Sequence, residues 1–331
     1  MAPGSYRPDE VTGPLRGLGL LRGDELMTRS DDRLFLIAGA TGKTGTTSVR
    51  LLLERGHRVR AFVHRPDERS EALAAAGAEI AAGDLLNFHD VSSAMRGVSG
   101  AYFAYPIAPG LLEATVVFAQ AAAEAGVRSV VNMSQISARR EATSNAARQH
   151  WLAERLLDRS PMLTAHLKPT FFAEWIILGW GRQGDHGVLR LPFGTGRHAP
   201  VAGVDQSYVI AAILEHPEPH DRQAYPLYGP VEMDHHGIAD AVSRALGIPV
   251  TYDPISIEQF ADTLAARGRS PHLIQHISNV AVDYQDGIFA GTNNLIEVIG
   301  NRTLMTVEDF VTSRKDAFQR NGPLYLPAGG Y

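Results

Sequence analysis

The chain has 331 residues and a formal net charge of −5, so it has room for one large or two ordinary domains and lacks the basic charge typical of nucleic-acid-binding proteins. Hydrophobic residues make up 44% of the chain, enough to bury a core, and the lack of cysteine excludes disulfides, thiolate metal sites and a cysteine nucleophile. Without an apolar run of the roughly 20 residues that a membrane helix needs, we expect a cytoplasmic protein with no membrane partner and no direct nucleic-acid partner.

The first residues carry glycine, proline, arginine and acidic side chains but no apolar segment, which is unlike a signal peptide. Met27 lies just before the first predicted strand. We therefore predict a loose N-terminal extension over residues 1–32, and leave open whether Met27 is a natural start.

A strand, a glycine turn and a helix follow one another between Leu34 and Gly56. The apolar run 34–38 is typical of a buried parallel strand, and apolar residues at helical spacing follow the turn. Glycine lets a pyrophosphate approach the backbone, and a helix N-terminus offers N–H groups, so the turn indicates a dinucleotide site. The alternative is a tight turn without a ligand. The residues assigned to the cofactor here are Gly39, Thr41, Gly42, Lys43, Thr44 and Gly45, although Lys43 could equally be solvated.

Strands and helices alternate up to residue 170. The predicted strands are 57–64, 78–84, 100–106, 129–134 and 163–168, and the predicted helices are 68–77, 87–97, 111–126 and 144–160. Strict alternation predicts a Rossmann-type, doubly wound α/β fold, with a parallel sheet and its ligand beyond the C-terminal strand ends. We assign residues 33–170 to this NAD(P)-binding domain. The strand ends carry Gly39, His64, Arg65, Asp84, Tyr105, Pro106, Ser134, Gln135, Pro169 and Thr170.

Beyond residue 170 the alternation loosens. Helices are expected at 205–215, with Asp205 as its cap, at 234–247, from Ser256, over 271–289 and from Thr306. Short strands are expected at 224–228 and 250–254. We assign residues 171–331 mostly to a smaller α+β substrate-binding subdomain that covers the sheet edge and closes a cleft.

Several motifs resemble the NmrA-like branch of the atypical short-chain dehydrogenases/reductases. They are Gly39-Ala-Thr-Gly-Lys-Thr-Gly45, Arg65, Gly83-Asp84-Leu85, Met133-Ser134, His150-Trp-Leu-Ala-Glu154, Lys168-Pro-Thr-Phe-Phe172, the segment around Asp205, and Met305-Thr-Val-Glu-Asp-Phe310. The resemblance covers about residues 33–320 and implies NAD(P) binding. The branch contains quinone and triphenylmethane-dye reductases, redox-sensing regulators that bind NADP without turnover, and tailoring reductases.

Arg65 stands where NAD-specific proteins usually place an acidic residue, so we expect NADP(H) to be preferred over NAD(H). A solvated surface arginine is the alternative. Asp84 and Leu85 are expected near the adenine, although Asp84 is also a candidate helix cap. We place Tyr105, Pro106, Pro169, Thr170 and Phe171 along the rest of the cofactor.

Ordinary family dehydrogenases carry Tyr-x-x-x-Lys in the helix after the fifth strand. Here Ala146 takes the tyrosine slot and His150 the lysine slot, so the proton-donating phenol is missing. His150 is a candidate acid, since histidine donates a proton near neutral pH, but it could instead hold the ribose. Ser134 matches the family serine or caps a turn.

Aromatic side chains near the expected nicotinamide end suit a flat acceptor, although core packing is the alternative for each ring. They are Phe103, Tyr105, Phe171, Phe172 and Trp175. The substrate candidates are Tyr105, Gln135, Phe172 and Trp175. His272 and His276 share a helix face, but no acidic residue completes a zincin pattern, so no metal site is predicted.

The sequence thus predicts an NADP(H)-dependent oxidoreductase that transfers hydride to a quinone-like or other extended aromatic acceptor. One alternative is a non-catalytic NADP-binding redox sensor that acts through a protein partner. Another is a tailoring oxidoreductase on an aromatic polyketide. Whether the chain forms a homodimer stays open.

Overall fold

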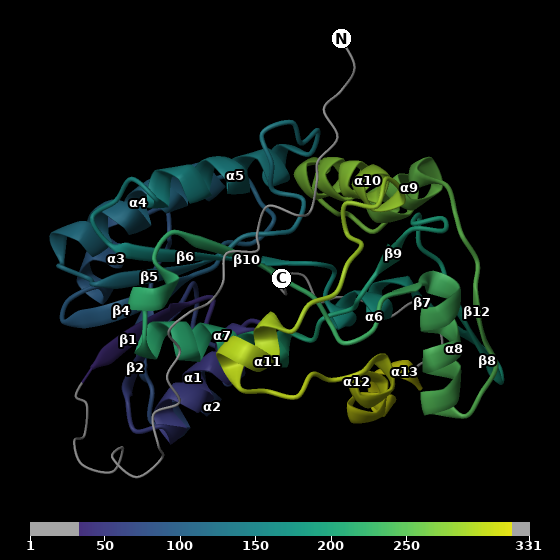
Figure 1. The fold of residues 1–331 in the computed structure, drawn as a ribbon, viewed down its shortest axis with the longest axis horizontal. Coiled ribbons are helices and arrows are strands. Elements are labelled where there is room, and N and C mark those ends of the chain that lie inside the picture. Colours follow the sequence, from purple (N-terminus) through teal and green to yellow (C-terminus); the bar gives the residue numbers. More distant parts are fainter. Residues whose placement is uncertain (1–32, 320–331) are drawn as a thin grey trace. The chain divides into compact units, whose positions relative to one another are not determined.

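The computed structural model of the chain describes residues 33–319, and seven parallel strands form its large sheet (Figure 1). The strand order is β3-β2-β1-β4-β5-β6-β10. The strands are β1 (Leu34–Ala38), β2 (Arg58–Val63), β3 (Glu79–Ala82), β4 (Val98–Phe103), β5 (Ser129–Met133), β6 (Leu163–Pro169) and β10 (Gln223–Leu227). The predicted parallel sheet is confirmed. The predicted extension over residues 1–32 lies outside the described residues.

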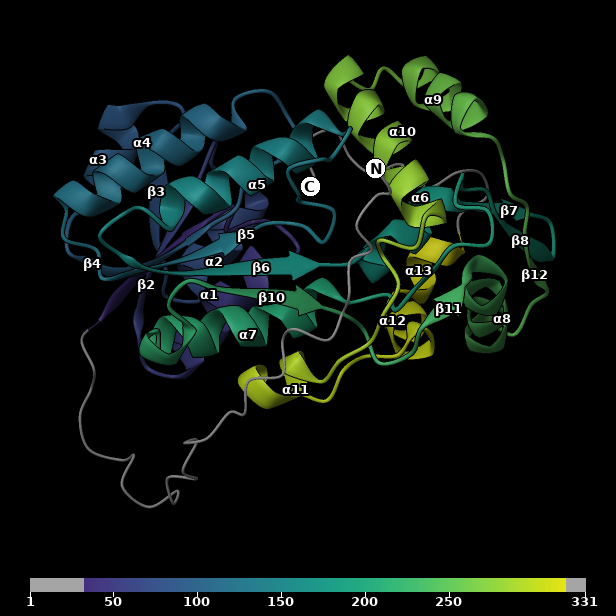
Figure 2. The same ribbon diagram turned by 45° about the horizontal axis from the view of Figure 1, so that its top comes forward.

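Helices cover both faces of this sheet, as the alternation predicts (Figure 2). In β1, Phe35 and Ile37 pack into the core beneath one set of helices, while Leu34 and Leu36 pack into the core beneath the other. The first set is α1 (Gly45–Glu54), α2 (Glu68–Ala75), α7 (Gly203–Glu215) and α11 (Leu295–Gly300). The second set is α3 (Phe88–Ala94), α4 (Leu111–Glu124) and α5 (Asn145–Leu157).

The strand order reverses direction between β1 and β4, which are neighbours in the sheet although β2 and β3 lie between them in the chain. In sheets of this kind a crevice opens beyond the carboxyl ends of the strands at the reversal point. The loops after β1 and β4 therefore border the place where a ligand is expected.

The remaining elements pack around a separate apolar core beyond the strand ends. Apart from η3 (Glu218–His220), they are η2 (Ala173–Trp175), α6 (Ile176–Gly179), β7 (Trp180–Gln183), β8 (His186–Leu189), β9 (Arg197–His198), β11 (Met233–Asp234), α8 (His235–Leu246), β12 (Val250–Tyr252), α9 (Ile257–Ala266), α10 (Pro271–Gln285), α12 (Val307–Ser313) and α13 (Lys315–Phe318). Strands β12, β8 and β7 form a small mixed sheet, and β11 pairs with β9. We call the elements of this core the C-terminal lobe; η3 lies apart from it, in the connection between α7 and β10.

Three later elements belong to the large sheet and not to the C-terminal lobe. Strand β10 pairs in parallel with β6, and α7 and α11 pack on the same face as α1. Pro226 lies within β10, where its missing N–H is tolerated because β10 has a partner on one side only.

The capping patterns at Ser256 and Thr306 are confirmed, since both residues form capping boxes. The prediction that Asp205 caps its helix is wrong. Helix α7 begins at Gly203, and the fully buried Asp205 instead accepts hydrogen bonds from Arg302 Nε at 3.1 Å and Met305 N at 2.8 Å. No helix within residues 33–319 is long and apolar enough to cross a membrane.

Candidate functional site

A cavity of about 700 Å³ lies beyond the carboxyl ends of the parallel strands and reaches the C-terminal lobe. It is lined from the glycine turn by Gly39, Thr41, Gly42, Lys43 and Thr44, from β2, α2 and the turns after β2 and β3 by Phe62, Val63, His64, Arg69, Gly83, Asp84, Leu85 and Leu86, from β4 and beyond by Tyr102, Ala104, Tyr105, Pro106 and Ile107, and from the later segments by Met133, Ser134, Gln135, His150, Pro169, Thr170, Phe171, Phe172, Trp175, His276, Val280 and Phe289.

The glycine turn brings strand β1 and helix α1 into close contact. Gly39 has a φ of +65°, which favours glycine, and a Cβ on Gly45 would lie 2.2 Å from the Gly39 carbonyl oxygen. Helix α1 has no side-chain cap on its first N–H groups, and the turn before it lines the cavity. These features suit a pyrophosphate at the helix N-terminus. Gly45 itself does not line the cavity but permits the close approach.

Two side chains of the turn interact with other parts of the fold. The buried Thr44 hydroxyl lies 2.8 Å from the Tyr102 hydroxyl in β4. Burial lowers the pKa of Lys43, and the nearby Glu174 carboxylate partly offsets this effect. The Glu174 carboxylate accepts a hydrogen bond from Gly203 N, which lies 3.2 Å from Oε1 and 3.3 Å from Oε2. Glu174 therefore satisfies the first N–H group of α7. Burial raises the pKa of Glu174. The glycine turn is thus coupled electrostatically to the C-terminal lobe.

On the side of the cavity formed by β2, α2 and the turn after β3, Arg69 lines the wall and Arg65 does not. Arg69 lies in the first turn of α2 and donates to Asp67 Oδ2 from Nε at 2.9 Å and from Nη2 at 2.6 Å. Arg65 is exposed in the turn that follows β2. Asp84 accepts from Leu86 N at 2.9 Å, while α3 is capped by Asn87, so Asp84 is not a helix cap.

His150 lines the cavity from α5 and is only 4% exposed. Its Nδ1 is buried without a hydrogen-bond partner in the described structure. Burial, together with the Lys168 ammonium, lowers the pKa of His150 from 6.5 to about 4. The ring is therefore neutral at pH 7. It can donate or accept one hydrogen bond, as a ribose hydroxyl requires, but it is not an imidazolium acid.

Ser134 belongs to a buried polar network below His150. Its hydroxyl donates to Glu154 Oε1 at 2.5 Å, and Lys168 Nζ lies 3.2 Å from the same oxygen. Lys168 also donates to the Ala138 carbonyl at 2.8 Å. Because the Ser134 proton points to Glu154, its oxygen offers only lone pairs to the cavity. Sequence reasoning names Glu154 only as part of a family motif, and it missed this network.

An aromatic group closes the end of the cavity next to the C-terminal lobe. Phe171 stacks on Phe289 with ring centroids 4.5 Å apart and meets Trp175 edge-on at 5.7 Å. Phe103, in contrast, packs against Phe118 at 4.7 Å in the core beneath the other helix layer and does not line the cavity. The Thr170 hydroxyl donates to the Phe289 carbonyl at 3.1 Å, which ties the end of β6 to this group.

Most of the predicted site residues therefore line one cavity, and the exceptions are Gly45 and Arg65. Sequence reasoning missed Arg69, His276 and Phe289. The N-cap Asp67 shows that Arg69 falls in the first turn of α2, so the helix start was an available signal. His276 and Phe289 lie more than 100 positions from β5, and no local pattern connects them with the site.

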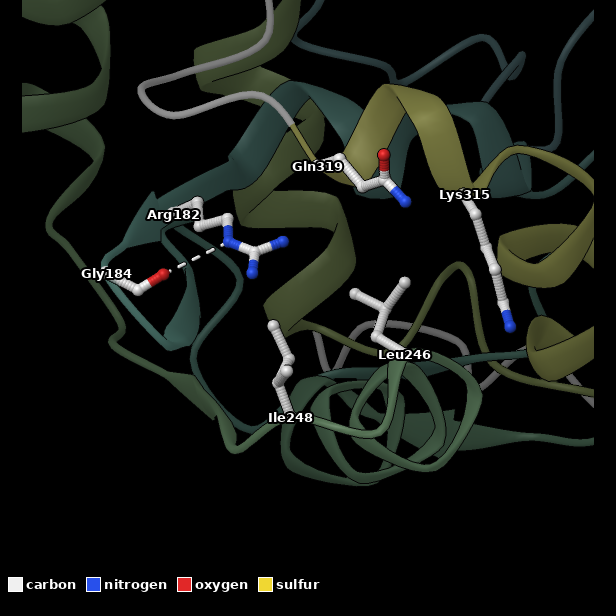
Figure 3. Close-up of a pocket in the computed structure, with 6 residues that line it drawn as sticks. All are labelled: Arg182, Gly184, Leu246, Ile248, Lys315 and Gln319. Atoms are coloured by element: carbon white, nitrogen blue, oxygen red, sulfur yellow. Dashed lines mark hydrogen bonds between the residues drawn. The ribbon is translucent and has the colours of Figure 1, made fainter.

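A second hollow of about 520 Å³ lies in the C-terminal lobe (Figure 3). It is lined by Arg182, Gly184, Leu246, Ile248, Lys315 and Gln319, and Arg182 Nε donates to the Gly184 carbonyl at 3.2 Å. It contains no aromatic ring and none of the candidate catalytic residues. Within residues 33–319, no cluster of three or more His, Cys, Asp or Glu could hold a metal ion.

Most of the residues that line this cavity lie in a segment that matches a known protein family. Residues 39–187 match a family model described as NAD(P)H-binding. The chain carries an NAD(P)H-binding domain. This domain contains the glycine turn, His150 and the Ser134–Glu154–Lys168 network, and the matched segment ends before β10.

Proteins similar to this chain over most of its length include reductases and a regulator. An NAD(P)H azoreductase of Xenophilus azovorans is 27% identical over 287 residues, which cover 86% of this chain and 99% of the azoreductase. The fold is shared with an NADPH-dependent quinone oxidoreductase from Escherichia coli complexed with NADPH, with a TM-score of 0.75, 21% identity, and coverage of 85% and 99% of the two chains. It is also shared with NmrA, a negative transcriptional regulator, with a TM-score of 0.68, 16% identity, and coverage of 87% and 95%.

The predicted resemblance to the NmrA-like branch is confirmed by these likenesses and by the NAD(P)H-binding domain. Together they support an NAD(P)H-dependent oxidoreductase.

Proposed function

We propose that the NAD(P)H-binding domain and the C-terminal lobe together form an NADPH-dependent reductase of quinone-like or other extended aromatic acceptors. One observation carries this proposal. A single cavity joins a glycine turn suited to pyrophosphate with a stacked aromatic group suited to a flat molecule. The azoreductase relative and the quinone oxidoreductase fold are consistent with this acceptor class.

Different residues of the cavity would bind different parts of the cofactor. The glycine turn and the N-terminus of α1 would hold the pyrophosphate, Arg69 the 2′-phosphate, and His150 a ribose hydroxyl. The bound nicotinamide supplies a hydride, and the chain supplies position and the exclusion of water. The reaction consumes one NADPH and one proton per quinone and yields NADP⁺ and hydroquinone.

We propose that the proton comes from water and not from a side chain. His150 is neutral at pH 7, and the Ser134 proton is directed to Glu154. A simple ketone becomes an alkoxide on hydride transfer and needs its proton promptly, whereas a quinone delocalises the arriving charge. We therefore expect NADPH oxidation with quinones and little with aliphatic ketones.

The test is the decay of NADPH absorbance with a panel of quinones, azo compounds and aliphatic ketones. Turnover with the conjugated acceptors alone supports the proposal. Fast reduction of aliphatic ketones would show that a residue of the chain supplies the proton. Tight NADPH binding without turnover of any acceptor would favour the redox sensor, a candidate that the missing acid also suits.

A further inference from the structure

The end of the cavity next to the C-terminal lobe carries little negative charge. Among all residues that line the cavity in the described part of the chain, Asp84 alone bears a carboxylate. Asp84 follows β3, and four strand spacings separate β3 from β5, roughly 19 Å at about 4.8 Å each. The buried Glu154 lies nearer, but Lys168 offsets its charge at 3.2 Å. No carboxylate that lines this end of the cavity is therefore placed to neutralise a cationic ligand.

Gln135 brings a hydrogen-bond donor to this end without a partner for it. Its Oε1 accepts from the Ser137 hydroxyl at 2.8 Å, while its Nε2 is buried and bonds to no atom of the described structure. A buried donor left in this way costs free energy that a ligand acceptor would recover. Gln135 follows β5 and lines the cavity, so a molecule bound there is a candidate source of the missing acceptor.

His276 is a second donor at the same end. It is 5% exposed, lines the cavity from α10, and has its Nδ1 2.8 Å from the Ser144 hydroxyl. Ser144 accepts from Ala147 N at 3.1 Å and can donate its proton to His276 Nδ1, the arrangement that we adopt. Burial, with His150 and His272 nearby, lowers the pKa of His276 to about 3. The neutral ring therefore keeps its proton on Nε2.

The segment before α5 holds both donors in place. Gln275 accepts from Asn145 N at 3.0 Å and donates to the Thr143 carbonyl at 3.0 Å. Arg139 pairs with Asp283 through contacts of 2.8 and 2.5 Å. Helix α10 is thus fixed to the loop that follows β5, and α5 and α10 lie close together in Figure 2. Donors held this way act without reorganisation.

We infer that Gln135 Nε2 and His276 Nε2 bind a lone-pair atom of a neutral or anionic planar acceptor, such as a quinone carbonyl oxygen or an azo nitrogen, and that permanently cationic dyes are poor substrates. This inference rests on the proposed function and narrows its substrate class. The acceptor takes two electrons as hydride and one proton from water, giving hydroquinone or the hydrazo compound, while NADPH becomes NADP⁺. The two donors stabilise the negative charge that arrives on the acceptor.

The experiment compares three probes: the neutral 2-methyl-1,4-naphthoquinone, the anionic azo dye methyl red, and the cationic dye crystal violet. Variants Gln135→Met and His276→Leu remove one donor each at similar volume, and His276→Gln restores an amide donor. His186→Leu, which changes an exposed histidine outside the cavity, is the matched control.

We expect wild type to favour the first two probes over crystal violet. Each donor variant should lower kcat/KM for them by between about tenfold and a hundredfold, with kcat affected more than KM. His276→Gln should recover part of the loss, and the NADPH Kd should not change. Wild-type preference for crystal violet, or donor variants that match His186→Leu, would overturn the inference.

A second measurement separates this inference from the proposed function. The Kd of 2-methyl-1,4-naphthoquinone for the NADP⁺-loaded protein is measured by calorimetry in all variants. If no acceptor turns over, the proposed reductase fails, yet weaker quinone binding in Gln135→Met and His276→Leu would still support the donor pair. Equal binding in every variant would contradict the donor pair whatever the turnover.

Discussion

Replacing Lys168 should destabilise the protein more than replacing its partner Glu154. The Glu154 side chain is 2% exposed and that of Lys168 is 17% exposed. In Lys168→Met the Glu154 carboxylate stays buried with the Ser134 hydroxyl and with Arg155 at 3.7 Å, so we expect a loss of about 3–4 kcal/mol in the free energy of unfolding. In Glu154→Gln the Lys168 ammonium keeps the Ala138 carbonyl and some water, so we expect a loss of about 1–2 kcal/mol.

The double variant Lys168→Met/Glu154→Gln should be more stable than Lys168→Met alone, because it leaves no buried charge. Urea unfolding followed by circular dichroism measures all three free energies. Arg190→Met is the control, since Arg190 and Asp253 form an ion pair in which both side chains are about half exposed, worth about 0.5 kcal/mol or less. Equal losses in the two single variants, or a larger loss in Glu154→Gln, would refute this account of the network.

Three further predictions concern the cofactor and acid stability. Gly45→Ala should weaken NADPH binding at least about tenfold in a titration, because its Cβ would lie 2.2 Å from the Gly39 carbonyl oxygen; an unchanged Kd would contradict the close approach. Arg69→Ala should lose about tenfold in NADPH affinity with little change for NADH, while Arg65→Ala should change neither; the reverse result would return the 2′-phosphate to Arg65. The free energy of unfolding should fall as the pH drops below 6.5, because the unfolded His150 then takes up a proton and the folded ring, with a pKa of about 4, does not. This contributes roughly 3 kcal/mol near pH 4, and a pH profile of urea unfolding that is the same in His150→Gln would contradict it.

The sequence was sufficient for the sheet up to β6 because local signals determine these elements. The buried strand β1 is a short apolar run, and glycine marks the turn where β1 and α1 approach closely. The same signals place the loops after the strands, and hence Ser134, Gln135 and Asp84, at one cavity.

Long-range contacts account for what sequence reasoning missed. The sequence around Asp205 is typical of a helix cap, but its carboxylate accepts hydrogen bonds from Arg302 and Met305, about 100 positions later. His276 reaches the cavity because α10 packs beside α5, and nothing in the sequence near His276 indicates that packing. Arg65 lies in the turn before α2 and Arg69 in the first turn of that helix, so the position at which α2 begins decides which of them meets the cavity.

Strand β10 has a consequence for how the chain folds during synthesis. Its partner β6 ends at Pro169, but β10 begins only at Gln223, after η2, α6, β7, β8 and β9 of the C-terminal lobe have been made. Until then the outer edge of β6 presents unpaired N–H and C=O groups, a known template for association between chains. A shortened chain that stops near residue 187, where the family match ends, would keep that edge permanently and lack helix α7 over the sheet. Such a fragment should self-associate even though it contains the whole glycine turn.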